Sequence, residues 1–210
     1  MTGGGAAAAI GPVLEVLNLA GIFVFAASGA LIAAEKKQTL VTFVFFAIVT
    51  GVGGGTVRDL LIGAPVFWME ENWTLLICFA AALIVWFLPM RGEGTGKALL
   101  WLDALGLAAF ATFGAAKGLA WGVAPLPAMA MGVLTACLGG IIRDVLAGDP
   151  SILMRAELYV TAAALSSVLM VGLLLAGVPG FVAGPAAALA GFALRAAAIR
   201  RGWALPAYTR

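Results

Sequence analysis

The segment TGVGGGTVRDLLIGAP at residues 50–65 returns as TACLGGIIRDVLAGDP at residues 135–150, 85 positions further along the chain and without a gap. Identical residues continue upstream at the same offset, in the pairs Leu17/Leu102, Gly21/Gly106, Phe25/Phe110, Ala26/Ala111, Gly29/Gly114 and Ala30/Ala115. The repeating unit is therefore much longer than the quoted segment. The sequence predicts a duplicated unit followed by a remainder.

The composition is typical of a membrane protein. Of the 210 residues, 63% are hydrophobic and only 10% are charged, and the mean hydropathy is +1.11. A soluble domain with this composition would expose large apolar patches. A membrane-crossing helix needs about 20 apolar residues. Five runs of suitable length contain no Asp, Glu, Lys or Arg: 16–34, 38–57, 72–90, 118–142 and 158–194.

The last of these runs is long enough for two crossings, because the Gly and Pro residues at 177–180 break it. A further apolar stretch lies between Lys97 and Lys117. The expected fold class is an all-α polytopic membrane protein with seven transmembrane helices. We place these spans at Pro12–Ala34, Leu40–Ile62, Asn72–Met90, Ala98–Ala116, Leu126–Ala147, Leu158–Ala176 and Phe181–Ala198.

Each copy of the duplicated unit contains three spans, and an odd number forces the second copy to enter the membrane from the opposite side. We therefore expect a single membrane domain built as an inverted 3+3 repeat plus one C-terminal helix. The first three-helix repeat covers 11–95, the second 96–179, and the seventh helix with a short tail 180–210. Folds of this kind place their substrate site near the midplane, at the repeat interface.

The distribution of cations predicts the orientation, because Lys and Arg are retained on the cytoplasmic side of a membrane. Nearly all loop and tail cations fall on one side of the seven-span topology: Lys36, Lys37, Arg91, Lys97, Arg155, Arg195, Arg200, Arg201 and Arg210. The sequence therefore predicts an inner-membrane protein with its N-terminus outside and its C-terminus in the cytoplasm. The net charge of +2 reflects this bias and does not indicate a nucleic-acid surface.

Four glycines at positions 51, 53, 54 and 55 lie inside the second span, and Gly139 and Gly140 repeat the feature in the fifth. Each glycine costs a helix about 1 kcal/mol relative to alanine in water, so the cluster implies either a kink or very close packing. Packing alone would account for small residues at four-residue spacing. A bend would instead turn backbone carbonyls toward a path, beside the hydroxyls of Thr50, Thr56 and Thr135.

The dipeptides Arg58-Asp59 and Arg143-Asp144 lie just inside the ends of the second and fifth spans. Ionisable groups are costly there. Adjacent residues on a helix do not face each other, so each charge is expected to pair with another part of the chain. The arginines either pin bent half-helices or form a charged constriction at each mouth.

Two further ionisable residues lie in the fourth span. Asp103, the counterpart of Asn18, is expected to interact with the amino-terminal helix dipole. Lys117 closes the span and is interpreted either as an interfacial anchor or as a positive gate at the outer mouth.

The residues that are missing argue against catalysis. The chain has no histidine, only two cysteines, no phosphate-binding glycine loop followed by Lys-Ser/Thr, and no Ser-base arrangement. We therefore expect neither an enzyme nor a metal site, and no cofactor or nucleic-acid partner. The remaining alternatives are a channel and a carrier.

The two glycine–Arg-Asp segments, on a three-plus-three-plus-one arrangement of spans, resemble the trimeric intracellular cation (TRIC) channel family in its bacterial form. The resemblance covers nearly the whole chain. It implies a homotrimer whose subunits each carry a potassium-permeable monovalent-cation pore, with potassium or sodium ions and membrane lipid as partners. It also implies that spans two and five line this pore. The corresponding positions are the kink residues Gly53, Gly54, Gly55, Gly139 and Gly140 and the polar or gating residues Thr50, Thr135, Arg58, Asp59, Arg143, Asp144 and Lys117.

The chain departs from the animal members of that family in two respects. It lacks their Lys-Glu pair in the fourth span, since Gly118 follows Lys117, and it lacks their long basic tail. Bacterial relatives are also described as transporters of a small amino acid, glycine. A secondary transporter of this kind is the alternative function, in which the helix ends and Arg58 or Arg143 would hold a carboxylate.

Overall fold

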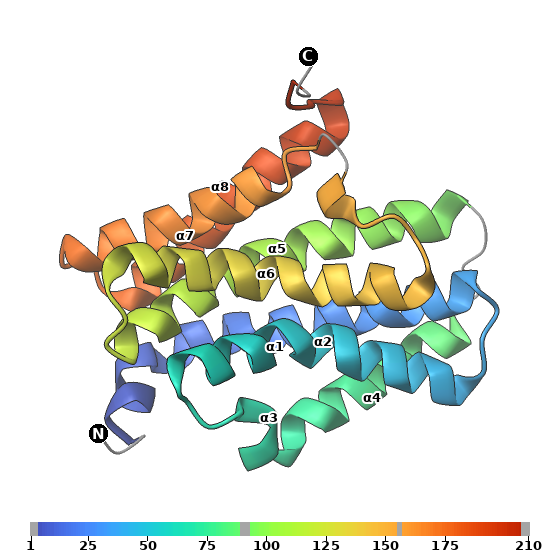
Figure 1. Cartoon of the computed structure of the whole chain (residues 1–210), viewed down its shortest axis with the longest axis horizontal. Coiled ribbons are helices and arrows are strands. Elements are labelled where there is room, and N and C mark those ends of the chain that lie inside the picture. Colours follow the sequence, from blue (N-terminus) through green and yellow to red (C-terminus); the bar gives the residue numbers. More distant parts are fainter. Residues whose placement is uncertain (1–3, 89–92, 155–156, 207–210) are drawn as a thin grey trace.

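A computed structural model describes residues 4–88, 93–154 and 157–206, and these residues are almost entirely helical (Figure 1). The helices are α1 (Gly4–Glu35), α2 (Leu40–Ile62), α3 (Phe67–Glu70), α4 (Asn72–Phe87), α5 (Glu93–Ala120), α6 (Pro125–Ala147), α7 (Val160–Leu175) and α8 (Gly180–Arg201), with a 3-10 turn at Ile152–Met154. Within the described ranges, the only β pairing is one isolated bridge between Glu157 and Ala204. The all-α class is confirmed.

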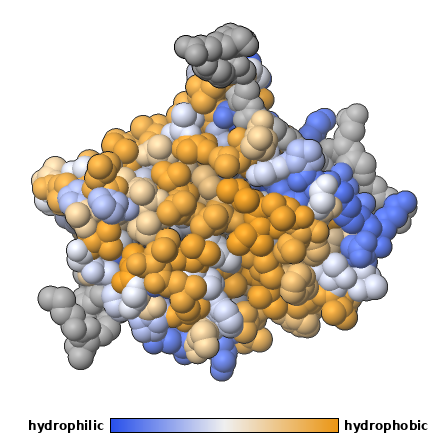
Figure 2. Space-filling view, in the orientation of Figure 1, coloured by the Kyte–Doolittle hydropathy of each residue, from blue (hydrophilic) through white to orange (hydrophobic). Residues whose placement is uncertain are grey.

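Five of the described helices are long and apolar enough to cross a membrane: α2, α5, α6, α8 and the part of α1 from Gly11 onward. Helices α4 and α7 are also apolar but contain 16 residues each, which is about 24 Å of helix. Figure 2 shows a broad apolar surface, with hydrophilic residues gathered at the end of the molecule where α1 ends and α2 begins. The chain is a multi-pass membrane protein.

Local sequence explains why some predicted boundaries match and others do not. Helix α2 spans the predicted Leu40–Ile62, because the Thr39 side chain accepts a hydrogen bond from the Thr42 amide and Gly63 ends the helix at a φ of 67°. Helix α5 is longer than the predicted Ala98–Ala116 at both ends, since charged residues continue the helix beyond its apolar part. The predicted end of the third span, Met90, lies outside the described residues.

Corresponding residues of the two copies contact each other between α1 and α5. The rings of Phe25 and Phe110, which are 85 positions apart, have centroids 5.1 Å from each other. A Cβ atom at Gly21 would lie 2.7 Å from the Phe110 ring, and one at Gly106 would lie 3.0 Å from the Phe25 ring. Residue numbers rise along α1 as the numbers of their partners fall along α5. The two helices are therefore antiparallel.

Helices α2 and α6 meet in the same reciprocal manner. A Cβ atom at Gly54 would overlap the carbonyl oxygen of Thr135, and one at Gly139 would lie 2.6 Å from the carbonyl oxygen of Thr50. These helices are also antiparallel, and in Figure 1 the C-terminal end of α2 and that of α6 lie at opposite ends of the molecule. The Arg-Asp dipeptides near those ends are consequently far apart.

Candidate functional site

Gly54 of α2 and Gly139 of α6 lie where the two helix backbones touch. Both helices remain uninterrupted, with no left-handed residue between their caps, so the glycines do not unwind them. A bend without a break stays a prediction. The contacts at Gly54 and Gly139 show very close packing of α2 against α6, because a side chain at either position would meet the backbone of the other helix.

The other predicted glycine and threonine positions surround this contact. A Cβ atom at Gly53 would lie 3.1 Å from Cδ1 of Ile142, and one at Gly55 would meet the Phe67 ring. The Thr135 hydroxyl donates to the Met131 carbonyl at 2.6 Å. Thr50 is fully buried, and its hydroxyl has no hydrogen-bond partner among the described residues.

The first arginine cluster consists of Arg58, Asp59 and Lys117, all of them buried. Asp59 Oδ1 accepts a hydrogen bond from Arg58 Nε at 2.8 Å, and Arg58 Nη2 and Lys117 Nζ lie 2.8 and 2.9 Å from the same oxygen. Asp59 Oδ2 accepts from the Phe67 amide at 3.1 Å. The Arg58 guanidinium also lies over the Phe113 ring, 5.2 Å from its centroid. One carboxylate thus holds two cations.

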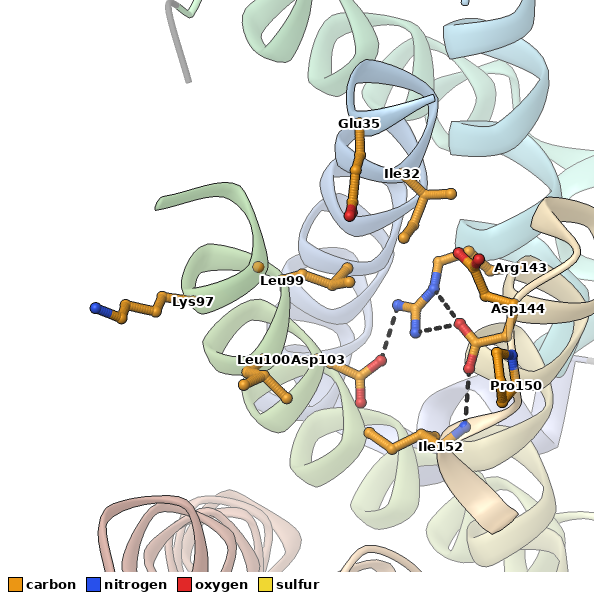
Figure 3. Close-up of a pocket in the computed structure, with 12 residues that line it drawn as sticks. Ile32, Glu35, Lys97, Leu99, Leu100, Asp103, Arg143, Asp144, Pro150 and Ile152 are labelled. Carbon is orange, nitrogen blue, oxygen red and sulfur yellow. Dashed lines mark hydrogen bonds and ion pairs between the residues drawn. The ribbon is translucent and has the colours of Figure 1, made fainter. Parts of the chain in front are cut away.

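The second arginine cluster consists of Arg143, Asp144 and Asp103 (Figure 3). Asp144 Oδ1 accepts from Arg143 Nε at 2.9 Å and from Nη2 at 2.8 Å, while Asp144 Oδ2 accepts from the Ile152 amide at 3.0 Å. Arg143 Nη1 donates to Asp103 Oδ1 at 2.9 Å and to the Ser28 hydroxyl at 3.0 Å. Here one guanidinium holds two carboxylates.

The residues that surround the two Arg-Asp dipeptides also correspond to each other at the offset of 85 positions. The amide that binds the aspartate comes from Phe67 in one copy and from its counterpart Ile152 in the other. The residue that contacts the guanidinium is Phe113 in one copy and its counterpart Ser28 in the other. The backbone framework is duplicated, and the side chains on it differ.

These side-chain differences reverse the charge. The buried groups of the first cluster sum to +1 and those of the second to −1, because Lys117 corresponds to Ile32 and Asp103 corresponds to Asn18. Glu15, which is exposed on α1, adds an acid that interacts electrostatically with the first cluster.

Two expectations about these charges are wrong, and a third interpretation loses one of its two alternatives. Adjacent Arg and Asp residues are not expected to pair, but each arginine binds the aspartate of its own dipeptide, because a long guanidinium side chain can turn back along its helix and offer two donors to one carboxylate. The expected pairing with other parts of the chain is present for Asp59 with Lys117 and for Arg143 with Asp103. Asp103 is not a helix-terminal residue, since α5 begins at Glu93, and it binds Arg143 instead. Lys117 is 8% exposed and bound to Asp59, so it is not an interfacial anchor, and the alternative of a positive gate at the outer mouth stays a prediction.

A fourth correction concerns Arg195, which the sequence places among the cytoplasmic tail cations. Helix α8 continues to Arg201, and Arg195 within it is buried, with Nη2 2.6 Å from Glu157 Oε2 and its guanidinium over the Tyr159 ring. A single arginine after an apolar run gives no signal of such a contact. Of the other cations used to predict the orientation, Arg91, Arg155 and Arg210 lie outside the described residues.

A cavity of about 510 Å³ opens beside the second cluster. Asp103, Arg143 and Asp144 line it together with Ile32 and Glu35, which lie near the end of α1. Lys97 also borders it, and Figure 3 shows its side chain directed away from the cluster. No group of three His, Cys, Asp or Glu side chains suited to a metal ion occurs among the residues that the structure describes.

A family sequence model described as "Glycine transporter" matches residues 15–90 and again residues 100–175, so the two matches are themselves offset by 85 positions. A TRIC channel orthologue from Rhodobacter sphaeroides has a similar structure, with a TM-score of 0.87 and 42% sequence identity over 91% of this chain and 99% of the orthologue. The chain belongs to the TRIC family.

Further relatives agree with this assignment. A prokaryotic TRIC channel studied in 0.5 M KCl is 28% identical to this TRIC-family chain, with a TM-score of 0.83 over 92% of the chain and 98% of that channel. A UPF0126 membrane protein of Vibrio cholerae is 35% identical over 204 residues, which are 93% of this chain and 82% of that protein. The UPF0126 inner membrane protein YadS of Escherichia coli is 38% identical over 148 residues, 70% of this chain and 72% of YadS.

Proposed function

We propose that this TRIC-family chain forms a potassium-permeable monovalent cation channel, with one pore in each subunit of a homotrimer, and that it is not an enzyme. The observation that carries the proposal is the pair of buried arginine clusters at opposite ends of the antiparallel helices α2 and α6. Ionisable side chains within membrane helices are costly, and they mark ion pathways. The similarity to solved TRIC cation channels supports the same conclusion.

The proposed architecture is the inverted repeat, with 11–95 and 96–179 as its two halves and 180–210 as the added helix and tail. Its support is the reciprocal, antiparallel contact of corresponding helices, together with the two family matches at the same offset. In this arrangement α4 and α7 are the shorter third helices of the two halves, and they complete the seven spans.

The proposed pore runs along α2 and α6, between the two clusters. The carbonyls of Thr50 and Thr135 face Gly139 and Gly54 across a backbone contact that leaves no space for an ion. Conduction therefore requires the two helices to separate at this contact, which acts as the gate. Arg58, Asp59 and Lys117 would then border one mouth, and Arg143 and Asp144 the other.

A second candidate function is secondary transport of a small amino acid such as glycine. The description of the matching family model favours it. Both arginine clusters combine positive and negative side chains, which are the partners that the carboxylate and the amine of an amino acid need.

One reconstitution experiment tests the proposed function against this alternative. The purified chain is placed in planar bilayers and in liposomes, and potassium currents and uptake of labelled glycine are measured on the same preparation. We expect discrete potassium currents and no glycine uptake above that of empty liposomes. Saturable glycine uptake without potassium current would contradict the channel and establish the carrier.

The homotrimer has a separate test. We expect crosslinking and light scattering in mild detergent to give a single trimeric species, since abundant Ala and Gly on the spans allow close helix contact. A conducting monomer or dimer would contradict this assembly.

The proposed orientation places the N-terminus outside and the C-terminus in the cytoplasm of the inner membrane. We expect the Thr2→Cys variant to react with an impermeant thiol reagent added outside, and the Thr209→Cys variant to react only from inside. The two native cysteines, Cys78 and Cys137, are buried and provide a low background. Labelling of both variants from one side would contradict the seven-span topology.

A further inference from the structure

Tyr159, the residue directly before α7, brings a buried hydroxyl to the second arginine cluster. Tyr159 and Asp103 are each 1% exposed, and the hydroxyl donates a hydrogen bond to the Asp103 carboxylate. The hydroxyl and Asp103 Oδ2 have no other hydrogen-bond partner among the described residues, while Asp103 Oδ1 binds Arg143. Because a buried polar atom without a partner is costly, each of these two groups depends on the other.

Helix α6 lies directly against this pair at Gly140. A Cβ atom at Gly140 would lie 3.1 Å from the Tyr159 hydroxyl oxygen and 3.3 Å from Asp103 Oδ1. The preceding residue, Gly139, meets the Thr50 carbonyl of α2. Successive residues of a helix point about 100° apart. One turn of α6 is therefore held on one side by α2 and on another side by Tyr159 and Asp103.

Arg195 of α8 holds Tyr159 from its other side. The Arg195 guanidinium lies over the tyrosine ring, 5.4 Å from its centroid, and Nη2 lies 2.6 Å from Glu157 Oε2. Arg195 is 1% exposed, and a cation over an aromatic ring is held more strongly when it is removed from water. A continuous set of contacts thus runs from α8 through Tyr159 to Asp103 and Arg143.

This set of contacts belongs to the second copy of the repeat. The positions that correspond to Asp103 and Tyr159 carry Asn18 and Thr74, which are neither acidic nor aromatic. Arg195 lies in the part of the chain that follows the two copies. The added helix α8 is consequently connected to one arginine cluster by a pair of side chains that the first copy does not have.

We propose that Tyr159 is a positioning residue for the second arginine cluster, and that Arg195 of α8 holds Tyr159 in place. The hydroxyl keeps the Asp103 carboxylate oriented toward Arg143, and it contacts α6 where that helix lies against α2, the closed position of the proposed gate. The seventh span thereby regulates the mouth at Arg143. This inference rests on the proposed function, because it assigns a closing contact to the proposed pore.

Tyr159→Phe is the direct test, because it removes the hydroxyl and keeps the ring beneath Arg195. We expect the open probability of the potassium current in planar bilayers to rise by about threefold or more at unchanged unitary conductance, since the closed position loses a hydrogen bond to a charged group. The matched control is Thr112→Val, which removes a buried hydroxyl of α5 that bonds only within its own helix, to the Ala108 carbonyl. It should keep the wild-type open probability. An unchanged open probability in Tyr159→Phe would overturn the proposal.

Arg195→Met tests the contribution of α8 and does not depend on the folding of Tyr159→Phe. It removes the charge above the ring, so we expect a smaller rise in open probability, and Arg195→Lys should restore the wild-type value by returning a cation to the ring. If Arg195 acts through the hydroxyl, adding Arg195→Met to Tyr159→Phe has no further effect. Full additivity of the two rises would overturn the role assigned to Arg195.

Thermal unfolding in detergent tests the contact between Tyr159 and Asp103 without any current. The variants Tyr159→Phe and Asp103→Leu are compared with the double variant, and we expect the double variant to lose less than the sum of the two single losses. Additive losses would overturn the contact. Absence of current from the wild-type protein would refute the channel, and the unfolding data would then still decide the contact. Wild-type currents with an unchanged Tyr159→Phe would refute this inference and leave the channel intact.

Discussion

The first and second arginine clusters share a backbone and differ in charge. In both, a buried Arg-Asp pair near the end of a helix binds an amide about eight residues further along the chain. The first cluster surrounds Asp59 with Arg58 and Lys117, and the second surrounds Arg143 with Asp144 and Asp103. The two copies therefore share one backbone framework. The side chains at two corresponding pairs of positions, Lys117 with Ile32 and Asp103 with Asn18, determine the charge of each cluster.

The two clusters therefore depend on different residues. Asp59 is the only acid among the buried groups of the first cluster, so the two cations rely on it together. Arg143 has two acids, so either of them can be lost while the guanidinium remains paired. This difference predicts unequal responses to equivalent substitutions.

The largest effect is expected from Asp59→Asn. This substitution removes the only buried acid beside Arg58 and Lys117, and breaking a buried ion pair from one side costs about 3–5 kcal/mol. Asp144→Asn should cost less, because Arg143 keeps its ion pair with Asp103. Thermal unfolding midpoints and trimer yields of the two variants in detergent measure the difference. Equal losses would show that the clusters do not differ in this way.

The shared framework is tested by Gly54→Ala, with Gly53→Ala as its control. A Cβ atom at Gly54 overlaps the Thr135 backbone, so we expect a loss of about 1–3 kcal/mol. At Gly53 the nearest atom is the flexible end of the Ile142 side chain, and alanine should be tolerated. Gly139→Ala is expected to behave like Gly54→Ala, because Gly139 meets the Thr50 backbone. Unfolding midpoints of the three variants in detergent provide the measurement.

The same contact changes the expected result for larger side chains at these positions. If the glycines only bent the helices to form a path, Gly54→Leu would give a stable trimer without potassium flux. The backbone contact instead predicts that Gly54→Leu forces α2 away from α6 and lowers thermal stability together with flux. A stable Gly54→Leu trimer with unchanged conductance would remove this segment from the proposed pore.

The smallest effects are expected at Ser28 and Phe113, which contact the arginine guanidinium groups from the other copy of the repeat. Ser28→Ala removes a hydrogen bond to Arg143 and should cost about 1 kcal/mol, since Arg143 Nη1 keeps its bond to Asp103. Phe113→Leu removes the ring beneath Arg58, an interaction worth about 0.5–2 kcal/mol. Unfolding midpoints of the two variants compare the contributions. A Ser28→Ala loss as large as that of Asp59→Asn would contradict the assigned hydrogen-bond network.

The membrane class, the all-helical fold and several helix boundaries follow from sequence alone. Apolar run length defines where a helix can cross a bilayer, and local signals at Thr39 and Gly63 define where α2 begins and ends. The 85-residue offset identifies which residues correspond, and it correctly relates Gly54 to Gly139 and Phe25 to Phe110. These features are predictable because they depend on neighbouring residues or on identity between the copies.

The partners of the charges were decided only by the tertiary structure. Lys117 and Asp59, like Arg143 and Asp103, are brought together by packing between helices that lie far apart in the sequence. Sequence spacing on one helix could not reveal these pairs, and it wrongly excluded the pairing of adjacent Arg and Asp. The cavity beside Ile32 was likewise undetectable, because it depends on which side chains three helices place against one another. Sequence determined the duplicated backbone, and packing determined the opposite charges that it carries, since side-chain contacts across helices depend on the assembled fold.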